Sequence, residues 1–242
     1  MRPTHGSAVC LGLVLSLLIS SGPTSEAADD FKLEAGYTSL FNGKDLTGWK
    51  LGKEVLDGKT ETASKKWHVT DGVIVIDGGG GGDIYTVQDF DKDYNLRLEF
   101  RAAPKADSGV YLRKEQLQVR DYPTVGPYKK VKFNDGDWNQ LDITVTGPVY
   151  SANVNGKAVS DKEVLEVIVK DGKPTAKLDG KPVDLSKIEI TAGAVALCKC
   201  NGEVVEKAMK CPLKGGIGLQ AETGKFEFRR VRVKELPSSD VK

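Results

Sequence analysis

Arginine, glutamine, tyrosine and glutamate side chains alternate with apolar ones between Asn95 and Asp121. Because successive side chains of a strand point to opposite faces, the polar residues are predicted to share one face. Such side chains bind planar or hydroxyl-rich ligands through several hydrogen bonds. We therefore predict a binding or catalytic face that contains Arg97, Glu99, Arg101, Tyr111, Arg113, Gln116, Gln118 and Arg120. The alternative is an ordinary solvated face, which is common in antiparallel sheets.

Short strands separated by turn signals make up most of the remaining chain. Pairs that favour tight hairpin turns occur at Asp71-Gly72, Asn155-Gly156, Asp171-Gly172 and Asp179-Gly180. Alternating apolar residues surround these turns, and helical periodicity is nearly absent. The pattern predicts an all-β fold, a jelly-roll β-sandwich of two antiparallel sheets. A curved sheet in such a sandwich would present its polar side as a concave groove suited to a sugar.

A run of five glycines, Gly78 to Gly82, lies between two predicted strands. A phosphate-binding loop would be followed by Lys-Ser or Lys-Thr and by a helix, and neither follows here. We therefore expect a flexible hairpin loop that lets a ligand or another backbone come close.

The N-terminus has the layout of a secretory signal peptide over residues 1–28. Arg2 precedes an apolar run from Val9 to Ile19, and a small-residue stretch ends at Ala28. The run is too short for a membrane span, so we expect cleavage, export to the periplasm or medium, and no membrane anchor afterwards. Residues 29–242 fit a single sandwich domain, with residues 160–214 as an elaboration within it.

The charge balance argues against polyanionic partners. Lysine and arginine number 35 against 34 aspartates and glutamates, so no net field attracts nucleic acid or an anionic membrane. A small neutral ligand fits this balance better. The sequence does not specify an oligomeric state.

Three cysteines, Cys198, Cys200 and Cys211, remain after the predicted leader. In an exported protein we expect a disulfide from Cys211 to either of the others, with one thiol left over. A zinc site that adds His68 is the less favoured alternative, because the paired two-residue spacing of zinc ligands is missing.

An ordered series of motifs resembles the 3-keto-disaccharide hydrolase domain family. The motifs are SLFNGKDLTGW, WHVTDGVI, LRLEFR, SGVYLR, EQLQVRD, DWN, GIGLQAE and FEFRRVRVKEL, and they run from Tyr37 to Leu236 apart from the segment 160–214. The resemblance implies a concanavalin-like sandwich that is exported by bacteria. It also implies cleavage of 3-keto-glycosides by elimination, followed by hydration of the glucal product.

Placed on this chain, the resemblance implies roles for individual side chains. Such chemistry needs a base, a stabiliser for the enolate oxygen and an acid for the leaving group. The expected base and acid are Glu99 and Glu222, with Asp142 as a weaker third, and the expected substrate-binding residues are Arg101, Tyr111, Arg113, Gln116, Gln118, Trp138, Gln220 and Arg229. For each arginine the competing interpretation is a salt bridge to a glutamate on a neighbouring strand.

One departure from the family pattern favours a second hypothesis. The family usually has a glutamate two places before the glutamine, where this chain has Gln116, and an amide cannot exchange a proton usefully at neutral pH. The chain is therefore either a lyase or hydrolase of 3-keto-glycosides or a non-catalytic carbohydrate-binding module. A structural envelope protein that pairs through its odd cysteine is a third hypothesis. No cofactor is predicted, although oxygen ligands on the polar face could hold a divalent cation.

Overall fold

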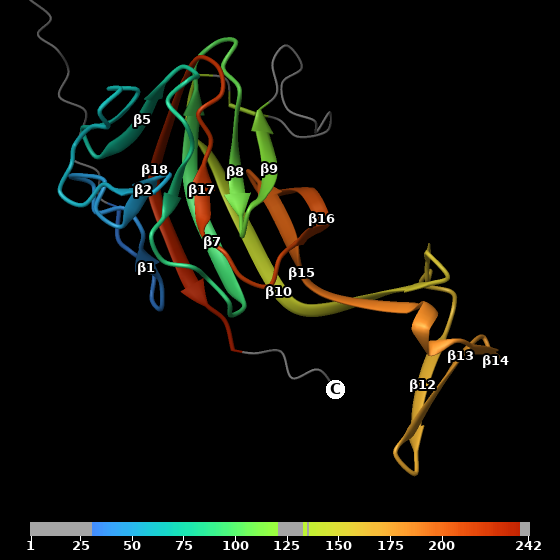
Figure 1. Cartoon of the computed structure of the whole chain (residues 1–242). Coiled ribbons are helices and arrows are strands. Elements are labelled where there is room, and N and C mark those ends of the chain that lie inside the picture. Colours follow the sequence, from blue (N-terminus) through green and yellow to red (C-terminus); the bar gives the residue numbers. More distant parts are fainter. Residues whose placement is uncertain (1–30, 121–132, 135, 238–242) are drawn as a thin grey trace, which may run out of the picture. The chain divides into compact units, whose positions relative to one another are not determined.

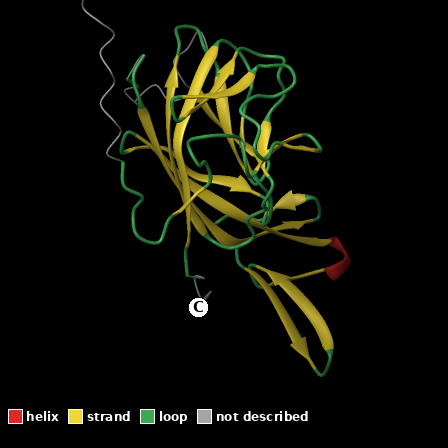
Figure 2. Cartoon of the chain, turned by 90° about the vertical axis from the view of Figure 1, so that its left-hand side faces the viewer, coloured by secondary structure: helices red, strands yellow, loops and turns green. Residues whose placement is uncertain are grey.

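The computed structural model describes residues 31–120, 133–134 and 136–237. The predicted signal peptide therefore lies outside the described residues. Leu33 to Lys242 form one contact unit. Its described residues are almost entirely strands and turns, with one short 3-10 helix, η1, at Leu185–Lys187 (Figure 2). No helix in the described ranges has the length and apolar character needed to cross a bilayer.

Nine of the described strands form the largest antiparallel sheet, called here the nine-stranded sheet. Their order is β16 (Glu203–Cys211), β15 (Ile188–Cys200), β10 (Asn139–Val154), β7 (Tyr94–Ala102), β18 (Lys225–Glu235), β5 (Val73–Asp77) and β4 (Trp67–Thr70), with β1 (Thr38–Ser39) on β18 and β11 (Lys157–Ala158) on β10.

Six more strands form the second layer, the six-stranded sheet. Their order is β3 (Glu54–Val55), β2 (Trp49–Leu51), β6 (Ile84–Thr86), β17 (Ile217–Leu219), β8 (Ser108–Leu112) and β9 (Glu115–Arg120). A separate three-stranded sheet follows β11 in the chain and contains β12 (Leu165–Lys170), β13 (Lys173–Leu178) and β14 (Lys181–Val183).

The two larger sheets pack face to face over one hydrophobic core, as Figure 1 shows for β8, β9 and β17 against β7, β10 and β18. Leu98 and Phe100 enter this core from β7, and Val110 and Leu112 enter it from β8. Side chains that alternate with these residues must point outward. The predicted two-sheet antiparallel sandwich is confirmed, and so are the four hairpin turns, whose aspartate or asparagine has a positive φ near 50°.

One expectation about the segment 95–121 is wrong. β7 and β8 do not share a sheet: β7 pairs with β10 and β18, whereas β8 pairs with β9 and β17. The turn between them carries the chain from one layer to the other. The outward residues of β7 therefore lie on one side of the sandwich, and those of β8 and β9 lie on the other.

The glycine run connects β5 in one sheet to β6 in the other, so the expected hairpin is wrong. The run does make the close backbone approach that its composition predicts. The N–H of Gly78 donates to the carbonyl of Gly224 at 2.9 Å. A Cβ placed on Gly79 would lie 2.0 Å from the carbonyl oxygen of Glu222. Only glycine can occupy position 79 without moving the segment around Glu222.

The expected disulfide is wrong, because the cysteines are too far apart. Cys198, Cys200 and Cys211 are buried free thiols. Cys211 lies opposite Ala194 on β15, which is four residues from Cys198 and six from Cys200. At about 3.3 Å per residue these offsets are roughly 13 and 20 Å, whereas a disulfide joins Cα atoms about 6 Å apart.

Candidate functional site

The outer face of the six-stranded sheet carries a row of aligned residues from four strands. Tyr85 on β6 is opposite Gly218 on β17, which is opposite Tyr111 on β8. Tyr111 is in turn opposite Gln116 on β9. Cross-strand neighbours lie about 5 Å apart, so the register brings two tyrosines and a glutamine onto one small surface.

Gly218 makes room for the two tyrosine rings. The ring centroids of Tyr85 and Tyr111 are 5.2 Å apart, and the ring planes are tilted by 39°. A Cβ on Gly218 would lie 2.5 Å from Cε1 of Tyr85. The absence of a side chain at position 218 therefore allows the Tyr85 ring to lie over the sheet and meet Tyr111.

Three glutamines form a hydrogen-bonded chain beside the tyrosines. Nε2 of Gln116 donates to Oε1 of Gln118 at 2.5 Å and to Oε1 of Gln220 at 2.9 Å. Nε2 of Gln118 donates to Oδ1 of Asp107 at 2.5 Å. Gly109 lies beneath them, since a Cβ there would be 2.8 Å from Nε2 of Gln116. The hydrogen bonds fix the orientations of the three amides, which lie over a part of the sheet where Gly109 has no side chain.

The tyrosine hydroxyls of this face are hydrogen-bond donors at neutral pH. Burial raises the pKa of Tyr111, and the Asp83 carboxylate raises it further through hydrogen bonding and its negative charge. Burial and the charge of Asp83 also raise the pKa of Tyr85. Asp83 itself accepts the N–H of Ala221 at 2.9 Å. Both phenols therefore stay protonated and can donate to a developing negative charge.

Three carboxylates border the glutamines and tyrosines. Asp107 is buried, and its backbone forms a bridge with Thr223. This bridge brings the segment of Glu222, an exposed residue, next to the Asp107 end of the glutamine chain. Sequence reasoning identified Glu222 but missed Asp83 and Asp107, because each lies just outside the strand whose alternation was followed. The aligned side chains and these carboxylates, Asp83, Tyr85, Asp107, Tyr111, Gln116, Gln118, Gln220 and Glu222, are called the tyrosine–glutamine face below.

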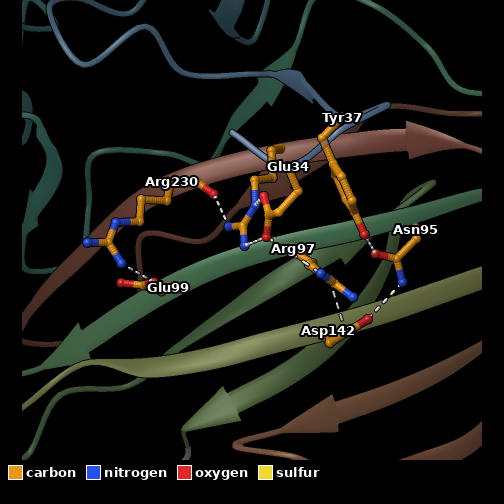
Figure 3. Close-up of polar contacts among 8 residues, drawn as sticks. Glu34, Tyr37, Asn95, Arg97, Glu99, Asp142 and Arg230 are labelled. Carbon is orange, nitrogen blue, oxygen red and sulfur yellow. Dashed lines mark hydrogen bonds and ion pairs between the residues drawn. The ribbon is translucent and has the colours of Figure 1, made fainter. Parts of the chain in front are cut away.

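The outer face of the nine-stranded sheet holds the other predicted residues, and they form ion pairs. Oε2 of Glu99 accepts from Nε of Arg229 at 2.8 Å, and Oε1 accepts from Nη1 of Arg230 at 2.6 Å. Figure 3 shows the second of these contacts. Both carboxylate oxygens of Glu99 are thus engaged by guanidinium groups.

Arg101 follows the same pattern, with Nε donating to Oε2 of Glu227 at 2.6 Å. The salt-bridge interpretation is therefore confirmed for Arg101 and Arg229. Trp138 packs against both guanidinium groups, whose carbons lie 4.7 and 3.9 Å from its ring centroid. The Trp138 ring on this face is therefore in contact with two arginine side chains.

Asp142 belongs to a second polar network on the nine-stranded sheet. Its Oδ1 accepts from Nδ2 of Asn95 at 2.7 Å, and its Oδ2 accepts from Nε of Arg97 at 3.1 Å. Arg97 also lies near Glu34, and the Tyr37 hydroxyl donates to Oδ1 of Asn95 at 2.5 Å (Figure 3). Neither Glu99 nor Asp142 shares a face with Gln116, Gln118, Gln220 or Tyr111.

The prediction that Arg113 lies on the polar face is wrong. Arg113 is in the tight turn between β8 and β9, has φ of 50° and is 1% exposed. Its guanidinium donates to the carbonyls of Lys92 at 2.5 Å and Pro212 at 3.4 Å, and it lies 5.2 Å from the ring centroid of Tyr94. β8 ends at Leu112, one residue before the position that the sequence predicts. Arg113 therefore belongs to the turn, and its guanidinium connects the turn to the neighbouring loops.

The sequence offered two candidate metal sites. One consists of the three cysteines with His68, and the other consists of oxygen ligands on the polar face. Within the ranges that the structure describes, no group of three or more histidine, cysteine, aspartate or glutamate side chains is placed to hold a metal ion.

Comparison with known proteins agrees with the motif resemblance. The family described as the 3-keto-alpha-glucoside-1,2-lyase-like domain matches residues 36–234. A 3-keto-disaccharide hydrolase of Bacteroides thetaiotaomicron is 28% identical in an alignment of length 250, and the alignment covers 83% of this chain and 79% of the relative. The resemblance drawn from the motifs is confirmed.

A solved structure supports the fold independently. A Parabacteroides distasonis protein, provisionally described as a glycosyl hydrolase, superposes with a TM-score of 0.53 at 20% identity. The superposition covers 84% of each chain. At this identity the similarity concerns the fold, which is again a sandwich of the predicted kind.

Proposed function

We propose that this chain, which belongs to the 3-keto-alpha-glucoside-1,2-lyase-like domain family, cleaves the glycosidic bond of 3-keto-glycosides on its tyrosine–glutamine face. The observation that carries the proposal is the alignment of Tyr85, Tyr111 and Gln116 across four strands, with Gly218 between the rings. Aromatic rings and fixed amides are the groups that recognise a sugar ring and its hydroxyls. The Bacteroides relative is named for hydrolysis of a 3-keto-disaccharide.

The proposed chemistry begins with the ketone at the third carbon of the sugar, which acidifies the proton on the second carbon. A carboxylate removes that proton, and the electron pair forms an enolate whose negative charge lies on the ketone oxygen. Collapse of the enolate expels the aglycone from the first carbon and leaves a double bond between the first two carbons. The departing oxygen takes a proton. Water then adds across the double bond, with its hydroxyl on the first carbon and a proton on the second, so the net reaction is hydrolysis.

The face provides groups for each of these steps. Glu222 is exposed and lies at the rim, where it can take the proton from a bound sugar. Tyr111 and Tyr85 retain their protons at neutral pH because burial and Asp83 raise their pKa values. Each phenol has a single proton to donate. Tyr85 is the proposed donor for the enolate oxygen, and Tyr111, which hydrogen bonds to Asp83, is the proposed donor for the leaving group once a bound sugar replaces that contact. Gln220 would orient the sugar hydroxyls.

A specific observation also favours a second function, non-catalytic carbohydrate binding. Gln116 occupies the position where the family pattern has a glutamate, and its amide donates to two other glutamines. An amide held in this way cannot act as a base. Under this hypothesis the same face binds a keto-sugar and releases it unchanged.

The deciding experiment incubates the protein with a 3-keto-disaccharide and, separately, with the same disaccharide unoxidised. Mass spectrometry follows the products with and without a chelator. We expect cleavage of the keto-sugar alone. Absence of cleavage with calorimetric binding intact would favour the binding module, and absence of both would refute the site. The predicted leader adds the proposal that the chain acts outside the cytoplasm, which N-terminal sequencing of the exported protein would test.

A further inference from the structure

The three-stranded sheet has an edge strand, β12, whose apolar side chains are exposed. Val167, Ile168 and Val169 are 47%, 48% and 67% exposed. Among the described strands only β13 pairs with β12, so its second edge carries no partner. Proteins usually shorten, charge or block such an edge, because its backbone groups can pair with another strand. β12 is therefore a candidate interaction surface.

The turn after β12 determines which backbone groups are offered. Asp171 and Gly172 have φ of 50° and 75°, the pattern of a two-residue type I′ hairpin. The closing pair Lys170–Lys173 is then hydrogen-bonded, and bonded and non-bonded pairs alternate along the hairpin. The N–H and C=O groups of Val167 and Val169 consequently point away from β13, toward the open edge.

The opposite edge of this sheet is blocked. β14 has three residues, and its turn at Asp179 and Gly180 again has two positive φ angles. The same alternation directs the backbone nitrogen of Pro182 outward, where proline has no N–H to donate. Of the two edges, only that of β12 offers a full set of donors and acceptors.

We propose that β12 pairs antiparallel with β12 of a second copy of this chain, across a two-fold axis at Ile168. This register places Val167 opposite the partner's Val169 and joins them by backbone hydrogen bonds. It also places Glu166 opposite the partner's Lys170, so opposite charges meet on the other face of the sheet. The three-stranded sheets of the two copies then join through their β12 strands into one continuous sheet.

Other registers lack this complementarity. A two-fold axis at Glu166 or at Lys170 places like charges directly opposite each other. An axis at Val167 leaves Glu166 opposite an isoleucine. The net charge of +1 on the chain adds little repulsion between copies.

The burial pattern within the sheet fits the missing neighbour. Ala176 on the central strand is 5% exposed, whereas Val167, directly opposite it on the edge strand, is 47% exposed. Both lie on the apolar face of the sheet. Another strand beyond β12 would cover Val167 from the side, as β12 and β14 cover Ala176.

Charge exchange tests the register in the full chain. We expect sedimentation velocity to show dimers of the unsubstituted protein, and a dissociation constant at least tenfold higher for Glu166→Lys and for Lys170→Glu. An equimolar mixture of the two variants should regain dimers, because each position 166 then faces the opposite charge at position 170 of the other variant. Lys207→Glu, the same charge change at an exposed position on β16, is the control that leaves dimerisation unaltered. Monomers at every concentration, or dimers that neither substitution weakens, would overturn the proposal.

A cysteine at the two-fold axis gives a second readout. Ile168→Cys places two thiols opposite each other, and mild oxidation should yield a covalent dimer on a non-reducing gel. Thr175→Cys, opposite Ile168 on β13, should remain at the level of the unsubstituted chain. Equal cross-linking in both variants, or none in Ile168→Cys, would exclude this axis.

Discussion

Glu99 lies on the outer face of the nine-stranded sheet and Gln116 on the outer face of the six-stranded sheet, with the hydrophobic core between them. Packed sheets are about 10 Å apart, so a small sugar that contacts the Gln116 amide cannot reach the Glu99 carboxylate. The carboxylates available to the proposed reaction are therefore Asp83, Asp107 and Glu222. Glu99 has a structural role as the partner of Arg229 and Arg230.

Glu99→Gln should lower stability and spare catalysis. The side chain is 13% exposed and holds two guanidinium groups, and a hydrogen bond between charged groups contributes about 1.5–3 kcal/mol. We expect the free energy of unfolding to fall by about 1–3 kcal/mol in chemical denaturation, with kcat within twofold. Glu222→Gln, the same substitution on the other face, should abolish turnover of the folded protein. A folded but inactive Glu99→Gln protein would contradict the assignment of the site.

Gly218→Ala should damage the site without unfolding the chain. The new Cβ would overlap the Tyr85 ring at 2.5 Å, and the ring must move away from Tyr111. We expect a KM for the keto-sugar, or a dissociation constant by calorimetry, that is at least tenfold higher, because a fixed aromatic contact is lost. Gly193→Ala on β15 is the matched control, since its Cβ would approach the Cys211 carbonyl only to 3.2 Å. Equal affinities in the two variants would show that the tyrosine pair does not contact the sugar.

The sequence contained enough information to predict strands, hairpins and the inward residues, but it did not show which sheet each strand joins. Leu98 and Val110 are both core residues, as the alternation of apolar side chains predicts. The alternation shows only whether a side chain points toward the core. The inward side chains of β7 and β8 enter the core from opposite sheets. The turn at 103–107 connects the two layers instead of two strands of one sheet. The predicted site residues are consequently divided between two faces of the sandwich.

Residues outside regular strands were the other source of error. Arg113 follows the alternation of β8 by one position, but it belongs to a turn with positive φ. Asp107 precedes β8 and has no alternation to identify it. Its role depends on the bridge with Thr223, which is distant in sequence and visible only in the structure. Gln116, Gln118 and Gln220 were identified correctly as outward residues because they lie within, or directly after, short regular strands.

The Glu34–Arg232 pair should make the unfolding temperature depend on acid pH. A hydrogen bond from Arg232 lowers the pKa of Glu34 from 4.5 to about 2. A depressed pKa means that the pair stabilises the fold above pH 4.5, and that this contribution is lost as the pH falls from 4.5 toward 2. We expect Glu34→Gln to lower the melting temperature at pH 7 and to flatten its decline over this interval. Glu54→Gln, which removes an exposed ion pair with Lys59, should behave like the unsubstituted chain.

The three buried cysteines should remain reduced and unreactive in the folded protein. Burial raises the pKa values of Cys198 and Cys200 to about 12, so both are protonated at pH 8 and carry almost no reactive thiolate. Maleimide labelling followed by peptide mass mapping should modify Cys198, Cys200 and Cys211 only after denaturation. A peptide that links Cys211 to either of the others in the non-reduced protein would contradict the register of β15 and β16.

Gln116→Glu should decide whether this position limits the chemistry. A carboxylate cannot donate to Gln118 and Gln220. The Gln220 amide can rotate to present its NH2 group, whereas Gln118 keeps its NH2 on Asp107, so we expect the fold to survive with one hydrogen bond fewer. The new group can accept the proton that the amide cannot. We expect turnover of a 3-keto-disaccharide to rise at least tenfold, with an acid limb near the ordinary glutamate pKa of about 4.3. Gln88→Glu, the same change at an exposed position after β6, should leave the rate unaltered. An unchanged or lower rate in Gln116→Glu would show that the site uses the amide itself, as a fixed donor to the sugar.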